Sequence, residues 1–250
     1  MTDWEDQLRR RQREAAIARP SCVEQYGYKV YSQSDEDGII AEIFHRIGTT
    51  NRTFVEFGAE VGQENNTRNL LEKGWSGLWI EGNPDYAGAI RAYFPEQIAS
   101  GQLKFVSDFV SVENINRLIG DAGLAGEIDL LSVDIDGNDF HVYDAISVIN
   151  PRVVVLEHNG YPPPIDWIMP YDPDFRWDGK TGEYGSSLVA NARLAAAKGY
   201  TIVATGIYSA NGFYVRNDLL GNHFPDLGPV EEFWRPLDYD AIVNFPKRRH

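Results

Sequence analysis

The amino-acid sequence predicts an α/β protein with a parallel sheet, and three observations support this fold class. Short apolar runs alternate with amphipathic stretches from residue 53 onward, which is the spacing of strand–helix–strand units. The run at 152–156, RVVVL, is apolar on both faces, as a central strand of a parallel sheet is. No repeat or low-complexity tract divides this part of the chain, so we expect one domain.

Each predicted strand is a short apolar run next to a turn or a helix signal. Strands are expected at residues 53–57, 77–80, 103–106, 128–133, 152–156, 200–204 and 212–215. Helices are expected at residues 66–73, 84–94, 112–119, 139–148 and 187–198. Gly74 is expected to close the first helix, Pro84 to begin the second and Ser111 to cap the third. Parallel strands place their carboxyl ends on one edge, where ligands of such sheets bind.

The chain is expected to consist of an N-terminal helical arm, residues 1–30, and a single domain, residues 31–250. A helix-permissive, arginine-rich stretch ends at Pro20. It could be a lid or a dimerisation arm through which two copies associate, or a solvated helix, and the last interpretation is favoured. The segment at about 160–185 is long and irregular, which is typical of lids and binding loops.

The composition bounds the class of protein. The chain has 250 residues, a formal net charge of −14 and 43% hydrophobic residues, which is ordinary for a globular protein. The excess of acids argues against a nucleic-acid partner held through phosphate contacts. The single cysteine, Cys22, forbids an intramolecular disulfide and favours a cytoplasmic location. No apolar run approaches the roughly 20 residues of a membrane helix, and residues 1–13 lack an apolar signal core, so no membrane partner is expected.

An acidic glycine turn follows the first predicted strand. Gly58 and Gly62 let the backbone turn tightly and approach a ligand closely. The dinucleotide pattern G-x-G-x-x-G is not met, because Glu60 occupies the position of its second glycine. A pyrophosphate would be repelled by Glu56 and Glu60. A cationic ligand such as S-adenosylmethionine, which carries an ammonium and a sulfonium, suits this turn.

The ends of the second and third predicted strands offer groups for a nucleoside. Glu81 follows the glycine turn by about 20 residues, the spacing at which a carboxylate can accept both hydroxyls of a ribose. It could also be an exposed acid at a strand end. Ser107, Asp108 and Phe109 follow the third strand, where an acid and an aromatic ring could hold an adenine.

The fourth predicted strand leads into the motif at 134–139, DIDGND, for which three interpretations compete. A calcium-binding EF-hand loop fails, because its sixth position is Asp139 rather than Gly and its twelfth is Ala145 rather than Glu. A phosphatase nucleophile of the haloacid-dehalogenase type, using Asp134 and Asp136, is conceivable, although that motif normally opens its fold. In the third interpretation, Asp134 lies beside a methyl donor or a divalent cation.

The fifth predicted strand ends in Glu157, His158 and Asn159, next to the strand that leads to Asp134. Oxygen ligands of this kind suit Mg²⁺, and Mn²⁺ if an imidazole joins them. His158 could instead be a general base, because an unperturbed histidine pKa near 6.5 is close to working pH. It could also be a hydrogen-bonded structural histidine.

The predicted lid is rich in aromatic side chains that could stack on a sugar or a nucleoside of the substrate. They could equally cover the edge of the sheet as a packed surface loop. The aromatic residues that we expect to form a substrate wall are Tyr161, Trp167, Tyr171, Trp177 and Tyr184.

Several motifs resemble FkbM-type S-adenosylmethionine-dependent methyltransferases. Residues 54–62, FVEFGAEVG, resemble the first motif of that family, and residues 130–139, LLSVDIDGND, resemble its fourth-strand motif. Residues 31–38 resemble the segment before its first strand, and residues 64–67 with 74–82 resemble a bacterial subgroup. Glu60 departs from the glycine of many class I methyltransferases.

The resemblance implies a Rossmann-like class I methyltransferase sheet of about seven mostly parallel strands, with helices on both faces. It also implies that the methyl donor binds across the first two strands. The expected donor-binding residues are Gln33, Glu56, Gly58, Ala59, Glu60, Gly62, Asn66, Thr67, Glu81, Gly82, Asn83, Ser107, Asp108, Phe109 and Asp134.

Metal-dependent O-methyltransferases of this fold place an Asp after the fourth strand and an acid–Asn pair after the fifth. Asp134, Glu157 and Asn159 match these places, with Asp136 as a further ligand, and His158 and Asp134 are the expected catalytic residues. The resulting hypothesis is an O-methyltransferase that acts on a hydroxyl of a small metabolite, such as a sugar, a nucleotide-linked intermediate or a natural product. The alternatives are the phosphatase and a ligand-binding domain without catalysis.

Overall fold

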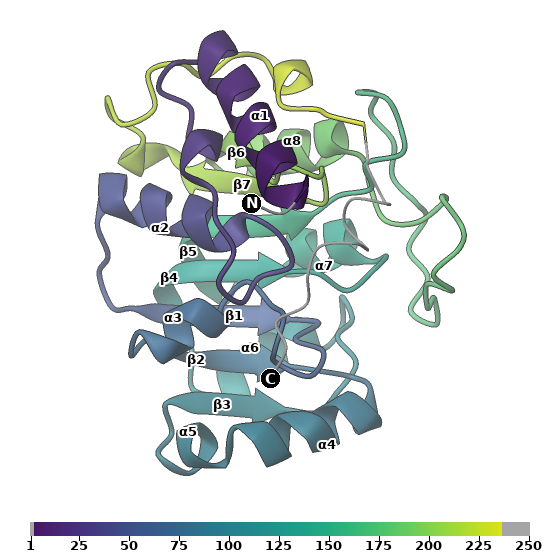
Figure 1. The fold of residues 1–250 in the computed structure, drawn as a ribbon. Coiled ribbons are helices and arrows are strands. Elements are labelled where there is room, and N and C mark those ends of the chain that lie inside the picture. Colours follow the sequence, from purple (N-terminus) through teal and green to yellow (C-terminus); the bar gives the residue numbers. More distant parts are fainter. Residues whose placement is uncertain (1–2, 237–250) are drawn as a thin grey trace.

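The computed structural model describes residues 3–236, and within them seven strands form a single sheet. The strand order is β3-β2-β1-β4-β5-β7-β6 (Figure 1). All neighbouring pairs are parallel except those of β7, which runs antiparallel to both β5 and β6. The predicted α/β sheet of about seven mostly parallel strands is confirmed.

All seven strands lie where the apolar runs predict them. Two have the predicted bounds, β1 (Thr53–Phe57) and β3 (Leu103–Val106). The others are one to four residues longer: β2 (Ser76–Ile80), β4 (Gly126–Val133), β5 (Ile149–Glu157), β6 (Tyr200–Thr205) and β7 (Asn211–Arg216).

The helices agree less closely with the prediction. They are α1 (Asp3–Ala18), α2 (Glu36–Ile47), α3 (Arg68–Glu72), α4 (Pro84–Tyr93), α5 (Pro95–Ala99), α6 (Ile115–Asp121), α7 (Asp139–Ala145) and α8 (Leu188–Ala197), with three 3-10 turns at Glu24–Tyr26, Asn217–Leu219 and Val230–Glu232. Neither α2 nor α5 was predicted. Ser111 does not cap α6, because the helix begins later and Asn114 is at its N-cap position, where the Asn114 side chain accepts the backbone N–H of Ser111. Helix α7 ends three residues early, since the Asn116 side chain accepts the N–H groups of Ser147 and Val148.

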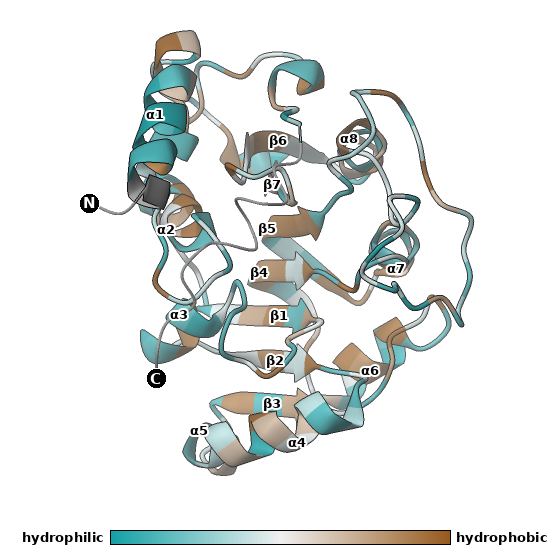
Figure 2. Ribbon diagram, turned by 45° about the vertical axis from the view of Figure 1, so that its right-hand side comes forward, coloured by the Kyte–Doolittle hydropathy of each residue, from teal (hydrophilic) through white to brown (hydrophobic). Residues whose placement is uncertain are grey.

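The sheet is covered on both faces, and its strands carry the most apolar stretches (Figure 2). Helices α6, α7 and α8 pack on one face, and α2, α3 and α4 on the other. Successive side chains of β1 alternate between the two cores: Val55 and Phe57 pack with the first set, and Phe54 with the second.

The N-terminal arm packs against its own chain. Leu8 and Ala15 of α1 are buried. The Arg11 guanidinium donates to the carbonyl of Ile207 at 2.9 Å, and the Gln12 amide donates to the carbonyl of Gly27 at 2.7 Å. One face of the arm is therefore in use within the chain, and its role in association of two copies stays a prediction. No helix within residues 3–236 is long and apolar enough to cross a membrane.

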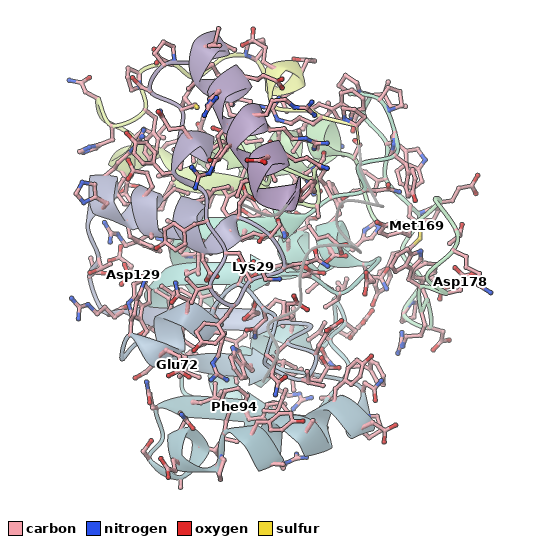
Figure 3. All side chains as sticks on the ribbon, in the orientation of Figure 1. Lys29, Glu72, Phe94, Asp129, Met169 and Asp178 are labelled. Carbon is pink, nitrogen blue, oxygen red and sulfur yellow. The ribbon has the colours of Figure 1, made fainter. Side chains whose placement is uncertain are left out.

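The acidic side chains at the two ends of the sheet have different surroundings. At the amino end, Asp129 accepts hydrogen bonds from the backbone of Thr50, Asn51 and Arg52, and it forms a buried ion pair with Arg152 at 2.8 Å. Figure 3 shows Asp129 at the opposite side of the molecule from Met169 and Asp178 of the lid segment. The acids at the carboxyl end border a cavity instead.

Candidate functional site

A cavity of about 490 Å³ lies at the carboxyl ends of β1, β2, β4 and β5. This is the topological switch point, where the strand order reverses between β1 and β4, and where open α/β sheets bind ligands. Fifteen of the predicted site residues line it: Gln33, Glu56, Gly58, Glu60, Asn66, Glu81, Gly82, Asp108, Phe109, Asp134, Asp136, Glu157, His158, Trp177 and Tyr184.

Nine predicted site residues are not part of the cavity wall: Ala59, Gly62, Thr67, Asn83, Ser107, Asn159, Tyr161, Trp167 and Tyr171. Ala59 is buried in the core on the α2–α4 face, and Ser107 is exposed. Most of the remaining seven residues make contacts, described below, that hold their side chains away from the cavity.

The glycine turn brings β1 against β4. Gly58 has a φ of +70°, and a Cβ atom there would come within 1.7 Å of the Asp134 carbonyl oxygen, so only glycine fits. Gly62 has a φ of +73° and lies against the rings of Trp79 and Phe94, so it serves packing rather than ligand approach. Glu60 adopts a φ of +47°, a left-handed conformation that is strained for a residue with a side chain.

Glu81 is held beside this turn at the end of β2. Its two carboxylate oxygens accept the backbone N–H groups of Glu60 and Asn83, each at 2.8 Å. Burial raises the pKa of Glu81. The Asn83 side chain is occupied at the start of α4, where it accepts the N–H of Asp85. Glu81 is thus fixed in place with oxygen lone pairs left for a ligand.

Glu56 organises the loop that follows the glycine turn. Its carboxyl group accepts the backbone N–H groups of Asn66 and Thr67 and the hydroxyl of Thr67. That hydroxyl also accepts the indole N–H of Trp79, so Thr67 is a structural link between β1 and β2. Burial raises the pKa of Glu56 to about 7, against the opposing effect of these hydrogen bonds.

The ring of Phe109, three residues after the end of β3, forms part of the cavity wall. The ring of Phe109 packs against Gly82, where a Cβ atom would come within 2.2 Å of the ring. The guanidinium of Arg176 lies over the same ring, 4.1 Å from its centroid. Arg176 belongs to the lid segment, so the lid covers this part of the cavity.

Three carboxyl groups converge between β4 and β5. Asp134, Asp136 and Glu157 each place one oxygen within 4.8 Å of the others. Asp139 shapes the loop by accepting the N–H groups of Ile135 and Gly137. Burial and the neighbouring acids raise the pKa of Asp134 and Glu157 well above their ordinary values and that of Asp136 to about 6. Three such oxygen donors match the preference of a hard divalent cation.

Asn159 does not join this group, in contrast to the expectation. Its amide N–H₂ donates to the carbonyls of Gly182 and Tyr184 at 2.7 and 2.9 Å, and its oxygen accepts the N–H of Tyr161 at 2.9 Å. Asn159 therefore ties the two ends of the lid together, and it is not part of the cavity wall.

His158 is buried, with its Nε2 3.1 Å from the hydroxyl of Ser209. Burial lowers the pKa of His158 to about 3, well below the ordinary histidine value. The ring is neutral at ordinary pH. Its Nδ1 has no hydrogen-bond partner within residues 3–236, and the residue borders the cavity.

Three asparagines that sequence reasoning missed also border the cavity, Asn65, Asn138 and Asn211. Both side-chain atoms of Asn65 and the side-chain oxygen of Asn211 are buried without a hydrogen-bond partner in the described part of the chain. Such atoms are rare in folded proteins and call for an explanation. Asn65 lies in a segment that carries the family resemblance. Asn211 has no signal in the sequence, because its place beside the site depends on the pairing of β7 with β5.

The lid is docked on the loop after β4. The ring of Phe175 packs on Gly137, and Asn138 exchanges two hydrogen bonds with the backbone of Asp172. Trp177 stacks on Tyr184 with ring centroids 4.7 Å apart, and both border the cavity. Figure 1 shows the lid segment, in green, beyond the tips of the strands.

The remaining predicted lid aromatics have other contacts. The Tyr171 hydroxyl donates to Glu113 at 2.9 Å and fastens the lid near α6. Tyr161 is 52% exposed, and the backbone of Trp167 pairs with Ser187 before α8. The structure therefore brings only Trp177 and Tyr184 of the expected substrate wall to the cavity, together with Phe175.

The cavity wall is strongly acidic. It includes one arginine, Arg176, and eight carboxylic acids: Glu56, Glu60, Glu64, Glu81, Asp108, Asp134, Asp136 and Glu157. This charge favours a cationic ligand and opposes a polyphosphate.

No protein-family model and no curated protein matches the chain. Among solved structures, it is similar to an O-methyltransferase from Bacillus cereus in complex with SAH (12% identity, 86% of this chain and 90% of that chain covered, TM-score 0.47). It is also similar to magnesium protoporphyrin IX methyltransferase from Synechocystis with bound SAM (15% identity, 86% and 98% covered, TM-score 0.46). A third is an S-adenosylmethionine-dependent methyltransferase from Clostridium acetobutylicum (11% identity, 71% and 89% covered, TM-score 0.44). These likenesses are distant.

Proposed function

We propose that this protein is an S-adenosylmethionine-dependent O-methyltransferase of the FkbM type. The observation that carries the proposal is the acidic cavity at the switch point, in which the Gly58 turn lies beside the fixed carboxylate of Glu81. A donor with a sulfonium, an ammonium and a ribose but no phosphate suits this charge and this turn.

The donor would lie across the ends of β1, β2 and β3. Glu81 would accept the ribose hydroxyls, because both its oxygens are oriented by backbone N–H groups. Phe109 would hold one face of the adenine, with Asp108 near its amine. The acids at the ends of β1 and β4 would face the cationic half of the donor, where their negative charge stabilises it.

The three carboxyl groups of Asp134, Asp136 and Glu157 fit a divalent cation, Mg²⁺ or Mn²⁺, on the chemistry of their donor atoms. When bound, such a cation would lower the pKa of the acceptor hydroxyl and orient it.

In the transfer, the acceptor oxygen attacks the methyl carbon in line with the sulfonium. The O–C bond forms, the C–S bond breaks and its electron pair stays on sulfur. The hydroxyl proton would move to Nδ1 of His158, in the tautomer whose Nε2–H donates to Ser209. The low pKa of His158 makes it a weak base, so most of the acceleration would come from holding donor and acceptor together.

The acceptor would be a small hydroxylated metabolite, such as a sugar, a nucleotide-linked intermediate or a natural product. The stacked rings of Trp177 and Tyr184 at the cavity wall support a ring-shaped acceptor, since aromatic faces pack on sugar rings. The single cysteine supports a reducing compartment such as the cytoplasm.

The phosphatase alternative has less support. A phosphomonoester would enter a wall of eight acids and one arginine, and Asp134 follows the fourth strand rather than the first. A binding domain without catalysis would hold the donor but transfer no methyl group.

The proposal is tested by calorimetric titration of the protein with S-adenosylhomocysteine and by transfer of a labelled methyl group to a pool of hydroxylated metabolites. Glu81→Gln is expected to weaken binding by about 10-fold or more, since it removes a charged acceptor. Glu96→Gln on α5 is the matched control, because Glu96 is an exposed acid away from the cavity. Hydrolysis of a phosphomonoester without binding of the donor product would favour the phosphatase, and binding without transfer would favour the binding domain.

A further inference from the structure

We propose that the side-chain oxygen of Asn211 is a fourth protein ligand of a divalent cation held by Asp134, Asp136 and Glu157. The inference rests on the metal site of the proposed function and does not depend on methyl transfer. It replaces Asn159, whose amide belongs to the lid.

The first observation is the state of the Asn211 side chain. Asn211 is 3% exposed, and its Oδ1 has no hydrogen-bond donor within residues 3–236. A buried amide oxygen is normally satisfied by a donor or by a bound group. The residue borders the same cavity as the three carboxyl groups.

The second observation is the register of the sheet. Asn211 is the first residue of β7 and pairs directly with Glu157, the last residue of β5. Directly paired residues of antiparallel strands have their Cβ atoms about 4.5–5.5 Å apart on the same face of the sheet. Asn211 and Glu157 therefore project side by side.

The position of Asn211 is also fixed by its neighbours. The carbonyl of Ala210 accepts the N–H of His158, and the carbonyl of Asn211 accepts the N–H of Gly206, both at 2.8 Å. These bonds hold the start of β7 against the end of β5. The side chain is thus presented by two paired strands rather than by a loose loop.

The chemistry of the set is consistent with one cation. Three carboxylates already carry more negative charge than a divalent ion neutralises. A neutral amide oxygen adds a hard ligand without adding charge, which is the kind of donor that Mg²⁺, Mn²⁺ and Ca²⁺ accept. The nearby imidazole of His158 is not part of the carboxylate group, so the site would be built of oxygen ligands.

The test is a titration of the donor-free, full-length protein with Mn²⁺. The electron paramagnetic resonance signal of the free ion measures how much Mn²⁺ remains unbound. Wild type is expected to bind one Mn²⁺, and Asn211→Ala to bind it at least about 10-fold more weakly. Asn211→Asp, which keeps an oxygen ligand at this position, is expected to retain binding. Asn159→Ala, the matched removal of a neighbouring buried amide, is expected to stay within about threefold of wild type.

The proposal is overturned if wild type binds no Mn²⁺, if Asn211→Ala binds it as wild type does, or if Asn211→Asp loses binding. Circular dichroism checks the fold of each variant, and Asn211→Ser replaces Asn211→Ala should the latter fail to fold. Titration with S-adenosylhomocysteine in the presence of a chelator separates the two proposals. Donor binding without a Mn²⁺ site contradicts this inference alone, and a Mn²⁺ site without donor binding contradicts the methyltransferase.

Discussion

The backbone carbonyl of Asp134 occupies the space that a side chain on Gly58 would need, because a Cβ atom there would come within 1.7 Å of the carbonyl oxygen. The contact joins the turn after β1 to the loop after β4. Gly58→Ala is expected to destabilise the protein by about 3 kcal/mol or more, since the residue is also in a left-handed conformation and the obstructing atom is backbone. Chemical denaturation measures the change.

The control for this prediction is Gly88, an exposed glycine inside α4 with free space around its Cβ position. Gly88→Ala is expected to stabilise the protein by about 0.5–1 kcal/mol, because alanine has the higher helix propensity. Equal effects of the two substitutions would show that the contact between Gly58 and Asp134 is not tight.

The unpartnered side chain of Asn65 is expected to bind a ligand and to lower the stability of the ligand-free protein. Asn65→Ala removes a buried amide without partners, so the free protein should keep its melting temperature or gain in it. The rise in melting temperature on adding S-adenosylhomocysteine should shrink, as for a roughly 10-fold loss of affinity. The neighbouring Asn66→Ala should instead lower the melting temperature, because the Asn66 amide donates to Ser132. A full ligand-induced shift in Asn65→Ala would contradict this role.

The lid is expected to depend on Asn159. Asn159→Ala removes three hydrogen bonds that join residues 161, 182 and 184, at a cost of about 1–3 kcal/mol. Hydrogen–deuterium exchange should speed up across residues 160–185 and stay unchanged in β1 and β4. Asp178→Ala is the comparison, since Asp178 accepts the N–H groups of Lys180 and Thr181 at the lid tip, and its effect should stay local. If residues 160–185 of Asn159→Ala exchange as slowly as in wild type, Asn159 does not hold the two ends of the lid together.

Glu56 is expected to make stability depend on pH. Burial raises its pKa from 4.5 to about 7 in the folded chain, so between these values the folded state holds a proton that the unfolded state has released. The contribution of Glu56 to stability is therefore fully present below about pH 4.5 and is lost as the pH rises through 7.

Glu56→Gln should remove this dependence. The difference in unfolding free energy between wild type and Glu56→Gln is expected to fall by about 2–3 kcal/mol from pH 5 to pH 8, as the shift implies. Urea unfolding at both values measures it. Parallel pH profiles for the two proteins would mean that Glu56 is ionised throughout.

The sheet and many of the residues that line the cavity could be predicted from the sequence, because both follow from local patterns. Buried strands are apolar runs wherever they occur, so all seven were predictable. Glu81 and Asp134 were found because parallel strands bring their carboxyl ends to one edge. The unpredicted α2 begins with Glu36 and Asp37, two buried acids in a segment that reads as polar.

Which polar groups meet could not be predicted from local patterns, because it depends on how distant segments pack. Asn159 follows Glu157 in the chain but bonds to the lid, while Asn211, 54 residues beyond Glu157, pairs with it because β7 runs antiparallel to β5. Burial shifts the pKa of His158 to about 3, and burial is a property of the packed molecule rather than of a residue type. Hydrogen-bond partners and solvent exposure depend on contacts between distant segments, so no local pattern encodes them.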